Sequence, residues 1–161
     1  KNTVFVIVAD HCSSSAGKTE LPMDKYRIPA MIFSEGFVQP QKFNALMSQI
    51  DVMPTLLGLL NFSYQSKFLG QDVFRPEFQP KAYVATYQDL GFIKGERLTI
   101  ISPVKKVKQY SLELEKSDLK PEFKLYYDEK LLKNPDQKLV DDAVSAYQST
   151  SYWLKTKQLN R

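Results

Sequence analysis

The feature that most constrains the fold is a run of six apolar residues, Val4 to Ala9, followed at once by Asp10 and His11. A short run of this length, rich in β-branched residues, is typical of a strand buried on both faces in a parallel sheet covered by helices. In open α/β sheets, ligands bind beyond the carboxyl ends of the strands. We therefore predict a core strand whose end presents a carboxylate and the imidazole of the only histidine in the chain.

The first half of the chain predicts further α/β structure. Residues 28–33 form a second apolar run that predicts a strand, and residues 44–60 predict a helix with a broad apolar face. The alternative is that residues 44–50 form a separate segment leading up to the helix. Asp51 is placed to act as an N-cap, accepting hydrogen bonds from the first free backbone amides. We expect residues 1–74 to form the buried, ligand-binding part.

The second half changes to a period of two, which indicates strands with one dry and one wet face, typical of an antiparallel sheet. The predicted strands cover residues 82–87, 90–93, 98–102, 110–114 and 123–128, with a hairpin turn at 94–97. A helix then closes the chain, with Asn134 as its N-cap and Pro135 in the first helical position. Residues 75–161 are thus expected to form an antiparallel sheet and a C-terminal helix.

Composition excludes several functional classes. The net charge of +4 comes from basic residues interleaved with acidic ones, which argues against a nucleic-acid partner. No stretch approaches the eighteen or so apolar residues of a membrane span. The single cysteine allows no internal disulfide, and no serine has a histidine–acid set for acyl transfer.

Asp10 and His11 carry the chemistry of a divalent-metal site, because a carboxylate oxygen and an imidazole nitrogen suit zinc, manganese or a related ion. Adjacent strand residues point to opposite faces, but beyond the strand end the backbone can turn, so that both reach one ion. The alternative is a polar strand end with an ordinary surface histidine. Two ligands do not close a site of four or more, so the others would be carboxylates, hydroxyls or residues outside this chain.

Residues 12–22 are expected to form a loop. Gly17-Lys18-Thr19 invites a phosphate-loop interpretation, but that motif requires glycine where Cys12 stands, and Pro22 would interrupt the helix that must follow. Cys12 itself is better explained as a small loop spacer than as a thiolate ligand.

Several stretches together resemble one protein family. Residues 6–11 resemble the metal-binding strand end of the alkaline phosphatase superfamily, in its sulfatase-like branch. Residues 12–22 and 24–29 look like the loop and next strand of membrane phosphoglycerol transferases, the relatives of lipoteichoic acid synthase. Residues 48–57 are similar to a helix start shared by sulfatases and these transferases, and residues 68–72 to the Gly-x-Asp turn that follows it.

The resemblance implies an α/β fold, the C-terminal portion of an alkaline phosphatase-like sandwich, with buried parallel strands, a small antiparallel sheet and a C-terminal helix. It implies a membrane-anchored parent whose catalytic domain lies outside the cytoplasm. There a threonine nucleophile, bound to a divalent metal, would move phosphoglycerol from a lipid head group to a glycan or lipid acceptor. Manganese is the expected metal, with zinc, magnesium or calcium as alternatives, and Asp10 and His11 match the family's late aspartate and histidine ligands.

The chain departs from the family pattern in what it lacks. The nucleophile, a glutamate ligand and the substrate-binding residues normally lie upstream of this strand. Neither Thr19 nor Thr55 is assigned the role of the missing nucleophile. Cys12 is not followed by the Cys-x-Pro/Ala-x-Arg pattern of sulfatase nucleophiles. We therefore expect a C-terminal part that is inactive without the upstream portion of the same polypeptide. The alternatives are a sulfatase or phosphodiesterase hydrolase, and a non-catalytic binding module with a structural Asp-His pair.

Overall fold

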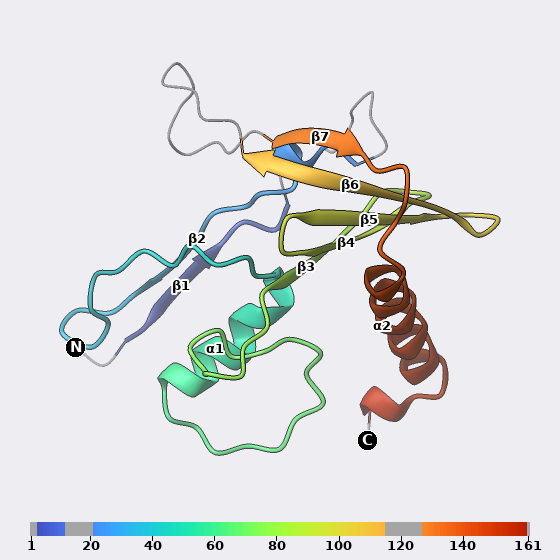
Figure 1. The fold of residues 1–161 in the computed structure, drawn as a ribbon. Helices are drawn as coiled ribbons and strands as arrows, with labels where there is room; N and C mark the ends of the chain where they lie inside the picture. The colour runs from blue at the N-terminus through green and yellow to red at the C-terminus, as the bar shows by residue number, and fades with distance from the viewer. Residues whose placement is uncertain (1–2, 12–20, 115–126, 161) are drawn as a thin grey trace.

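A computed structural model describes residues 3–11, 21–114 and 127–160 (Figure 1). Within these ranges, two sheets, one of two strands and one of five, are accompanied by two α-helices and short 3-10 turns. In chain order the elements are β1 (Phe5–Val8), η1 (Met23–Lys25), β2 (Ala30–Phe33), η2 (Gln49–Asp51), α1 (Val52–Leu59), β3 (Lys81–Ala85), β4 (Leu90–Lys94), β5 (Arg97–Ser102), β6 (Lys106–Leu114), β7 (Tyr127–Leu131), α2 (Gln137–Lys155) and η3 (Gln158–Asn160).

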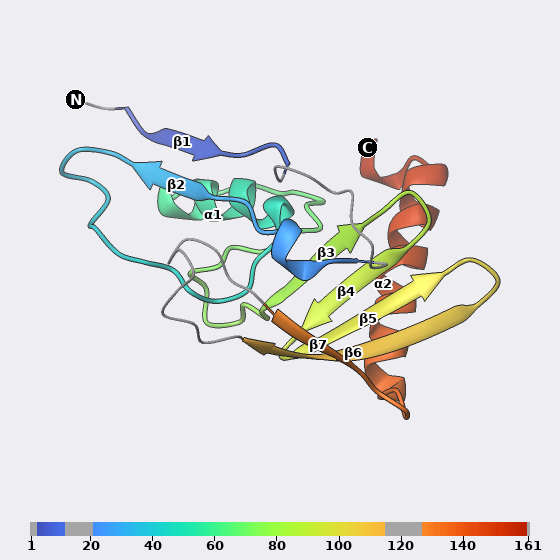
Figure 2. The same cartoon turned by 90° about the horizontal axis from the view of Figure 1, so that it is seen from above.

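The five-stranded sheet is antiparallel throughout, and its strands follow chain order from β3 to β7. Figures 1 and 2 show α2 across one face and the segment containing η1 on the other. On the η1 face, Leu21 and Met23 pack on a buried apolar cluster from the sheet, namely Ala82, Ile93, Leu98, Ile100 and Leu112. This cluster is the core of the described chain.

The face beneath α2 is buried although it carries polar residues. Thr99 and Gln109 are cross-strand partners and are almost completely buried. The Gln109 side chain donates to Thr99 Oγ1 at 2.9 Å and accepts from the Asp136 N–H at 2.8 Å. These hydrogen bonds satisfy the buried amide. The face of the sheet that was expected to be wet can therefore lie beneath the helix.

Helix α2 begins later than its sequence predicts. Asp136, and not Asn134, is the N-cap, since its carboxylate accepts from the N–H groups of Lys138 and Leu139 at 2.9 and 3.4 Å. The predicted hairpin turn is confirmed, with Gly95 at a positive φ of 58° between β4 and β5. The last predicted strand falls largely on residues that the structure does not describe, and β7 begins at Tyr127.

The prediction of parallel, fully buried first strands is wrong. β1 pairs antiparallel with β2, from Phe5 opposite Phe33 to Val8 opposite Ala30. Phe5 and Ile7 are 55% and 56% exposed, whereas the alternate residues of β1 are half-buried. An apolar run shows that both faces of a strand are apolar, but it does not show that this chain covers both.

None of the described helices is both long and apolar enough to cross a membrane.

Candidate metal site

The end of β1 is held by two neighbouring segments. The Ala9 N–H donates to the carbonyl of Pro29 at 3.2 Å, which extends the pairing with β2 by one step. The Ala9 carbonyl accepts from Gln49 Nε2 at 3.0 Å, which ties the strand end to η2. Asp10 and His11 therefore leave the sheet beside the start of the α1 segment.

The two predicted site residues lie together. Asp10 Oδ2 and His11 Nε2 are 3.5 Å apart, and the His11 N–H donates to Asp10 Oδ1 at 2.9 Å. Both side chains are open to solvent, 88% exposed for Asp10 and 77% for His11. The turn beyond the strand thus brings an oxygen and a nitrogen donor to one exposed point.

This spacing suits two ligands of one ion. With metal–ligand distances of about 2.1 Å, two ligands of a tetrahedral ion are about 3.4 Å apart. Within the described ranges, however, no group of three or more His, Cys, Asp or Glu side chains could hold a metal. Cys12 and the Gly17-Lys18-Thr19 stretch lie outside those ranges. The described residues alone offer a half-site of two donors.

Asp51 occupies the predicted N-cap position of α1, but its carboxylate accepts no hydrogen bond from the amides of that helix. Its buried carboxylate accepts from the Ser48 N–H at 2.8 Å and from the Gln71 N–H at 2.7 Å. The first bond closes the η2 turn, and the second fastens a segment twenty positions later in the chain. The α1 segment therefore starts through a 3-10 turn, with Asp51 pointing away from the helix amides.

Thr55 completes this connection. Its hydroxyl donates to the Asp51 carbonyl at 2.6 Å and accepts from the Val73 N–H at 3.1 Å. We call Asp51, Thr55, Gln71 and Val73 the 51–73 junction. With its oxygen buried and both hydrogen-bonding capacities used, Thr55 has a structural role in this junction.

The Gly-x-Asp turn belongs to the same junction. A Cβ at Gly70 would overlap the Ile50 carbonyl, and a Cβ at Gly58 would overlap the Asp72 carboxylate. Glycine is required at position 70, where the overlap is with backbone atoms, whereas a side chain at position 58 would require the Asp72 carboxylate to move. The two sequence motifs at residues 48–57 and 68–72 are thus two sides of one packed unit beside the end of β1, which sequence reasoning treated as separate.

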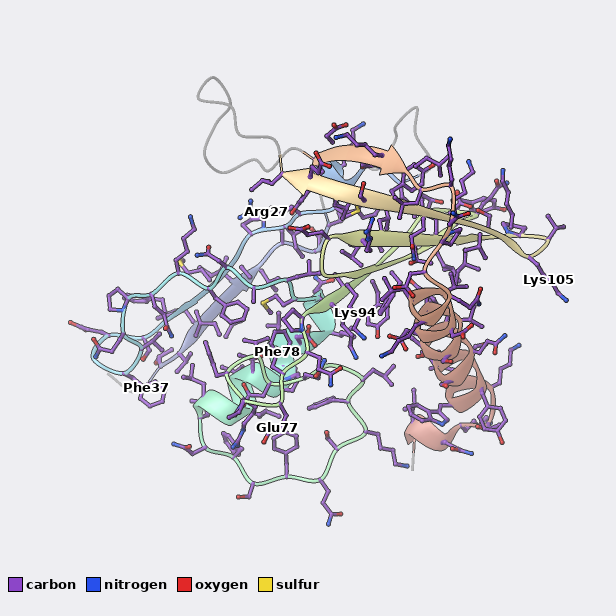
Figure 3. All side chains as sticks on the ribbon, viewed as in Figure 1. Arg27, Phe37, Glu77, Phe78, Lys94 and Lys105 are labelled. Carbon is purple, nitrogen blue, oxygen red and sulfur yellow. The ribbon has the colours of Figure 1, made fainter. Side chains whose placement is uncertain are left out.

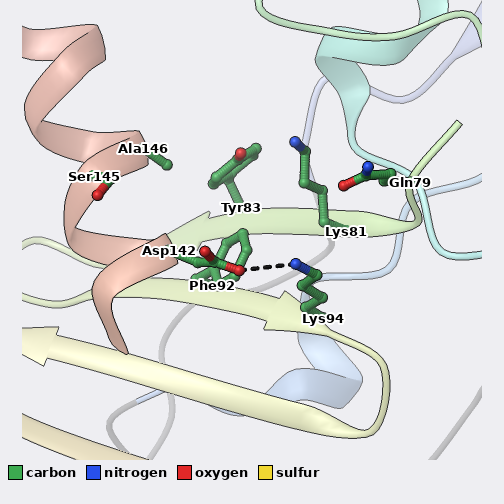
Figure 4. Close-up of a pocket in the computed structure, with 8 residues that line it drawn as sticks. All are labelled: Gln79, Lys81, Tyr83, Phe92, Lys94, Asp142, Ser145 and Ala146. Atoms are coloured by element: carbon green, nitrogen blue, oxygen red, sulfur yellow. Dashed lines mark hydrogen bonds and ion pairs between the residues drawn. The ribbon is translucent and has the colours of Figure 1, made fainter. Parts of the chain in front are cut away.

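A hollow that the sequence did not predict lies between the five-stranded sheet and α2. This cavity of about 200 Å³ is lined by the Phe92 ring, Ala146 and six polar residues, Gln79, Lys81, Tyr83, Lys94, Asp142 and Ser145 (Figure 4). Its residues are up to 67 positions apart in the chain, from Gln79 to Ala146, so no local motif predicts it. The sequence predicts Lys81 just before a strand and Lys94 in the hairpin turn, whereas the structure places them in β3 and β4.

Electrostatics in this cavity are set by burial and by one ion pair. The hydrogen bond from Lys94 Nζ to Asp142 Oδ2, 2.8 Å long, lowers the pKa of that carboxyl. Burial, followed by the charges of Asp51 and Asp142, raises the pKa of Tyr83. Burial also raises the pKa of Tyr147, whose hydroxyl lies 2.7 Å from the Gly91 carbonyl oxygen and 3.2 Å from that of Val84.

Two comparisons with known proteins bear on this arrangement. The family model described as Sulfatase matches residues 1–62, which include β1, the Asp10-His11 pair and α1. A protein in the alkaline phosphatase superfamily from Vibrio parahaemolyticus has a similar structure, with a TM-score of 0.79 and 24% sequence identity. The alignment covers 96% of this chain and 35% of that chain, so this chain spans about a third of the length of its structural neighbour.

The structural match confirms the predicted fold class. The α/β arrangement of a small two-stranded sheet, a five-stranded antiparallel sheet and a C-terminal helix corresponds to part of a larger alkaline phosphatase-like fold. The Sulfatase match covers the segment that carries Asp10 and His11. Nearly the whole chain therefore has the fold of one portion of an alkaline phosphatase superfamily protein, with likeness to sulfatases over its first 62 residues.

Proposed function

We propose that this chain is the C-terminal part of a metal-dependent transferase that moves phosphoglycerol, or a related phosphodiester group, from a lipid head group to a glycan or lipid acceptor. The observation that carries the proposal is the convergence of Asp10 Oδ2 and His11 Nε2, 3.5 Å apart, just beyond β1. The likeness to sulfatases over residues 1–62 supports a site of this superfamily at that strand end.

In this proposal Asp10 and His11 are two ligands of a divalent ion, with manganese preferred and zinc, magnesium or calcium as alternatives. When bound, such an ion lowers the pKa of a coordinated hydroxyl and offsets charge on phosphoryl oxygens. The role of this chain's residues is to hold the ion at a rigid strand end. The bonds from Ala9 to Pro29 and Gln49 supply that rigidity.

The other half of the site is assigned to the upstream portion of the same polypeptide, which is the proposed partner. That portion would supply the threonine nucleophile and the missing ligands, and its membrane helices would hold this domain outside the cytoplasm. The Vibrio structure, about three times the length of this chain, supports the presence of further structure around the same fold. The chain alone is accordingly proposed to be inactive.

Manganese titration tests the proposal. The chain alone should bind Mn²⁺ weakly, and Asp10→Ala or His11→Ala should abolish that binding. The matched control is Glu35→Ala, because Glu35 is an exposed carboxylate in the turn after β2, at the opposite end of the two-stranded sheet. Adding the upstream portion should strengthen binding at least about tenfold, since it completes the ligand set. Binding that is tight without the upstream portion, or unchanged by Asp10→Ala, would contradict a catalytic half-site and favour a separate binding module.

A hydrolase of the same superfamily is the second candidate, favoured by the match to the Sulfatase family model. The two functions differ in whether an alcohol or water accepts the transferred group. The full-length protein, supplied with a phosphodiester and an alcohol acceptor, should form the transferred product if it is a transferase. Release of only the free acid would favour the hydrolase.

A further inference from the structure

Three basic residues form a row across the sheet face that α2 covers. Lys81 lies directly opposite Lys94, and Lys94 lies directly opposite Arg97, in the registers of β3 with β4 and β4 with β5. Like charges in directly opposed positions destabilise a sheet. Such a row is therefore a cost to this fold unless something negative lies against it.

The protein itself supplies only part of that negative charge. Asp142 on α2 pairs with Lys94 at 2.8 Å, and Figure 3 shows Lys94 directed toward the helix. Over the described ranges, no carboxylate lies within ion-pair distance of Lys81 or Arg97. At the cavity between sheet and helix, the two ammonium groups of Lys81 and Lys94 therefore share the single carboxylate of Asp142, whose pKa both of them lower.

The cavity offers more than charge. Figure 4 shows the ammonium groups of Lys81 and Lys94 beside the Gln79 amide on one side, with Asp142 and Ser145 on the other. The rings of Tyr83 and Phe92, 5.5 Å apart, form an apolar floor. The amide and the hydroxyl add neutral hydrogen-bond donors to the two cations.

We propose that this cavity binds a tetrahedral oxyanion, a phosphate or sulfate group, between Lys81 and Lys94, with any small organic part lying over Tyr83 and Phe92. Hydrogen bonds between an ammonium group and an oxyanion are charge-assisted and are therefore among the stronger hydrogen bonds in proteins. The volume of about 200 Å³ has room for a phosphate or sulfate group. The site lies on the five-stranded sheet and does not depend on the function proposed for Asp10 and His11.

In this proposal, the Asp142 carboxylate competes with the bound anion for the Lys94 ammonium. It neutralises Lys94 while the cavity is empty and must share that ammonium when an oxyanion enters. Removing its charge should therefore tighten anion binding. The neighbouring Asp141 is a matched control, since it accepts from Gln137 at 2.8 Å and Asp141→Asn changes the net charge by the same amount.

The test is a titration of the chain with sodium phosphate and, separately, sodium sulfate at constant ionic strength, followed by NMR. We expect saturable shifts at Lys81, Lys94 and Ser145, and the tighter of the two anions identifies the ligand class. Lys81→Met should weaken binding about tenfold, because one charge-assisted hydrogen bond is lost. Lys106→Met, an exposed lysine of β6 that does not line the cavity, should change it less than about twofold.

Asp142→Asn should tighten phosphate binding several-fold, and Asp141→Asn should not. Ser145→Ala, which leaves the charge unchanged, should weaken binding and tests the cavity even if Lys81→Met folds poorly. Shifts that do not saturate, or that respond equally to the Lys81 and Lys106 substitutions, would overturn the proposal. Neither anion titration involves Asp10 or His11. Failure of the oxyanion proposal would therefore leave the manganese test unaffected.

Discussion

Thr55 shows how one hydroxyl can define the role of a whole motif. It joins the start of α1 to the segment around Val73 through one donated and one accepted hydrogen bond, while Asp51 bonds the Gln71 N–H from the same junction. Both side chains are about 3% exposed. When one partner of a buried hydrogen bond is removed, the other partner is left unsatisfied. This costs more free energy of folding than the hydrogen bond itself contributes.

Thr55→Val should lower the free energy of unfolding by about 1–3 kcal/mol, because the Val73 N–H would be buried without an acceptor. Thr55→Ser keeps the hydroxyl and removes only a methyl group, so it should lose less than the valine variant. Urea unfolding followed by circular dichroism gives both values. Equal stability of the valine variant and the unchanged protein would show that the junction is not needed for the fold.

Helix α2 is fixed to the sheet by contacts at several points along its length. The Asp136 N–H donates to the buried Gln109, Asp142 pairs with Lys94, and the Tyr147 hydroxyl lies within hydrogen-bond distance of the Gly91 carbonyl. Val140 and Ala143 are buried between these contacts. Of these contacts, only the Lys94–Asp142 pair involves a carboxyl group, so the pH dependence of the helix attachment should come from Asp142.

The Lys94–Asp142 pair should stabilise the protein only where Asp142 is ionised. Its pKa is lowered below the ordinary 3.8, so the contribution is present above that pH and is lost as the pH falls below it. Asp142→Asn should therefore reduce the unfolding free energy near neutral pH by at most about 1 kcal/mol, the range of partly exposed ion pairs.

The difference between the asparagine variant and the unchanged protein should shrink as the pH is lowered toward about 3. Unfolding midpoints measured across this range give the comparison, with Asp141→Asn as the control for lost surface charge. A difference that persists unchanged in acid would indicate that Asp142 acts through packing and not through its charge.

The elements of the second half were predictable because their signals are local. The period of two and the short turn at Gly95 lie within single strands and hairpins, so β3 to β5 appear within two residues of their expected bounds, whereas β6 begins four residues earlier than expected. The pairing of β1 was not predictable, since an apolar run carries no information about strand direction. The start of α2 was missed by two residues because both Asn134 and Asp136 are good caps, and only the second meets the amides of the helix.

At the scale of the whole molecule, the sequence predicted contacts between neighbours and missed contacts across the chain. Asp10 and His11 could be paired because they are adjacent, and their separation of 3.5 Å follows from one turn of backbone. The hydrogen bond between Asp51 and Gln71 and the ion pair between Lys94 and Asp142 form only when the chain is folded. The oxyanion cavity is therefore a property of the tertiary structure that no motif encodes.

The outer face of the two-stranded sheet is an exposed apolar surface, which this chain is not expected to stabilise alone. Four large apolar side chains, Phe5, Ile7, Met31 and Phe33, are cross-strand neighbours there, and each is more than half exposed. A two-stranded sheet is at best marginally stable without a covering layer. In the proposed enzyme, the upstream portion of the polypeptide would cover this face.

The chain by itself should bind a hydrophobic dye and associate through this face, because contiguous apolar patches favour association. Replacing Met31 and Phe33 by threonine should reduce both effects while retaining β propensity and leaving the five-stranded sheet intact. Tyr87→Thr, at a fully exposed site in the turn after β3, is the matched control and should change neither. Dye fluorescence and sedimentation give the two readouts. If adding the upstream portion failed to suppress dye binding by the unchanged chain, that portion would not be the layer that covers β1 and β2.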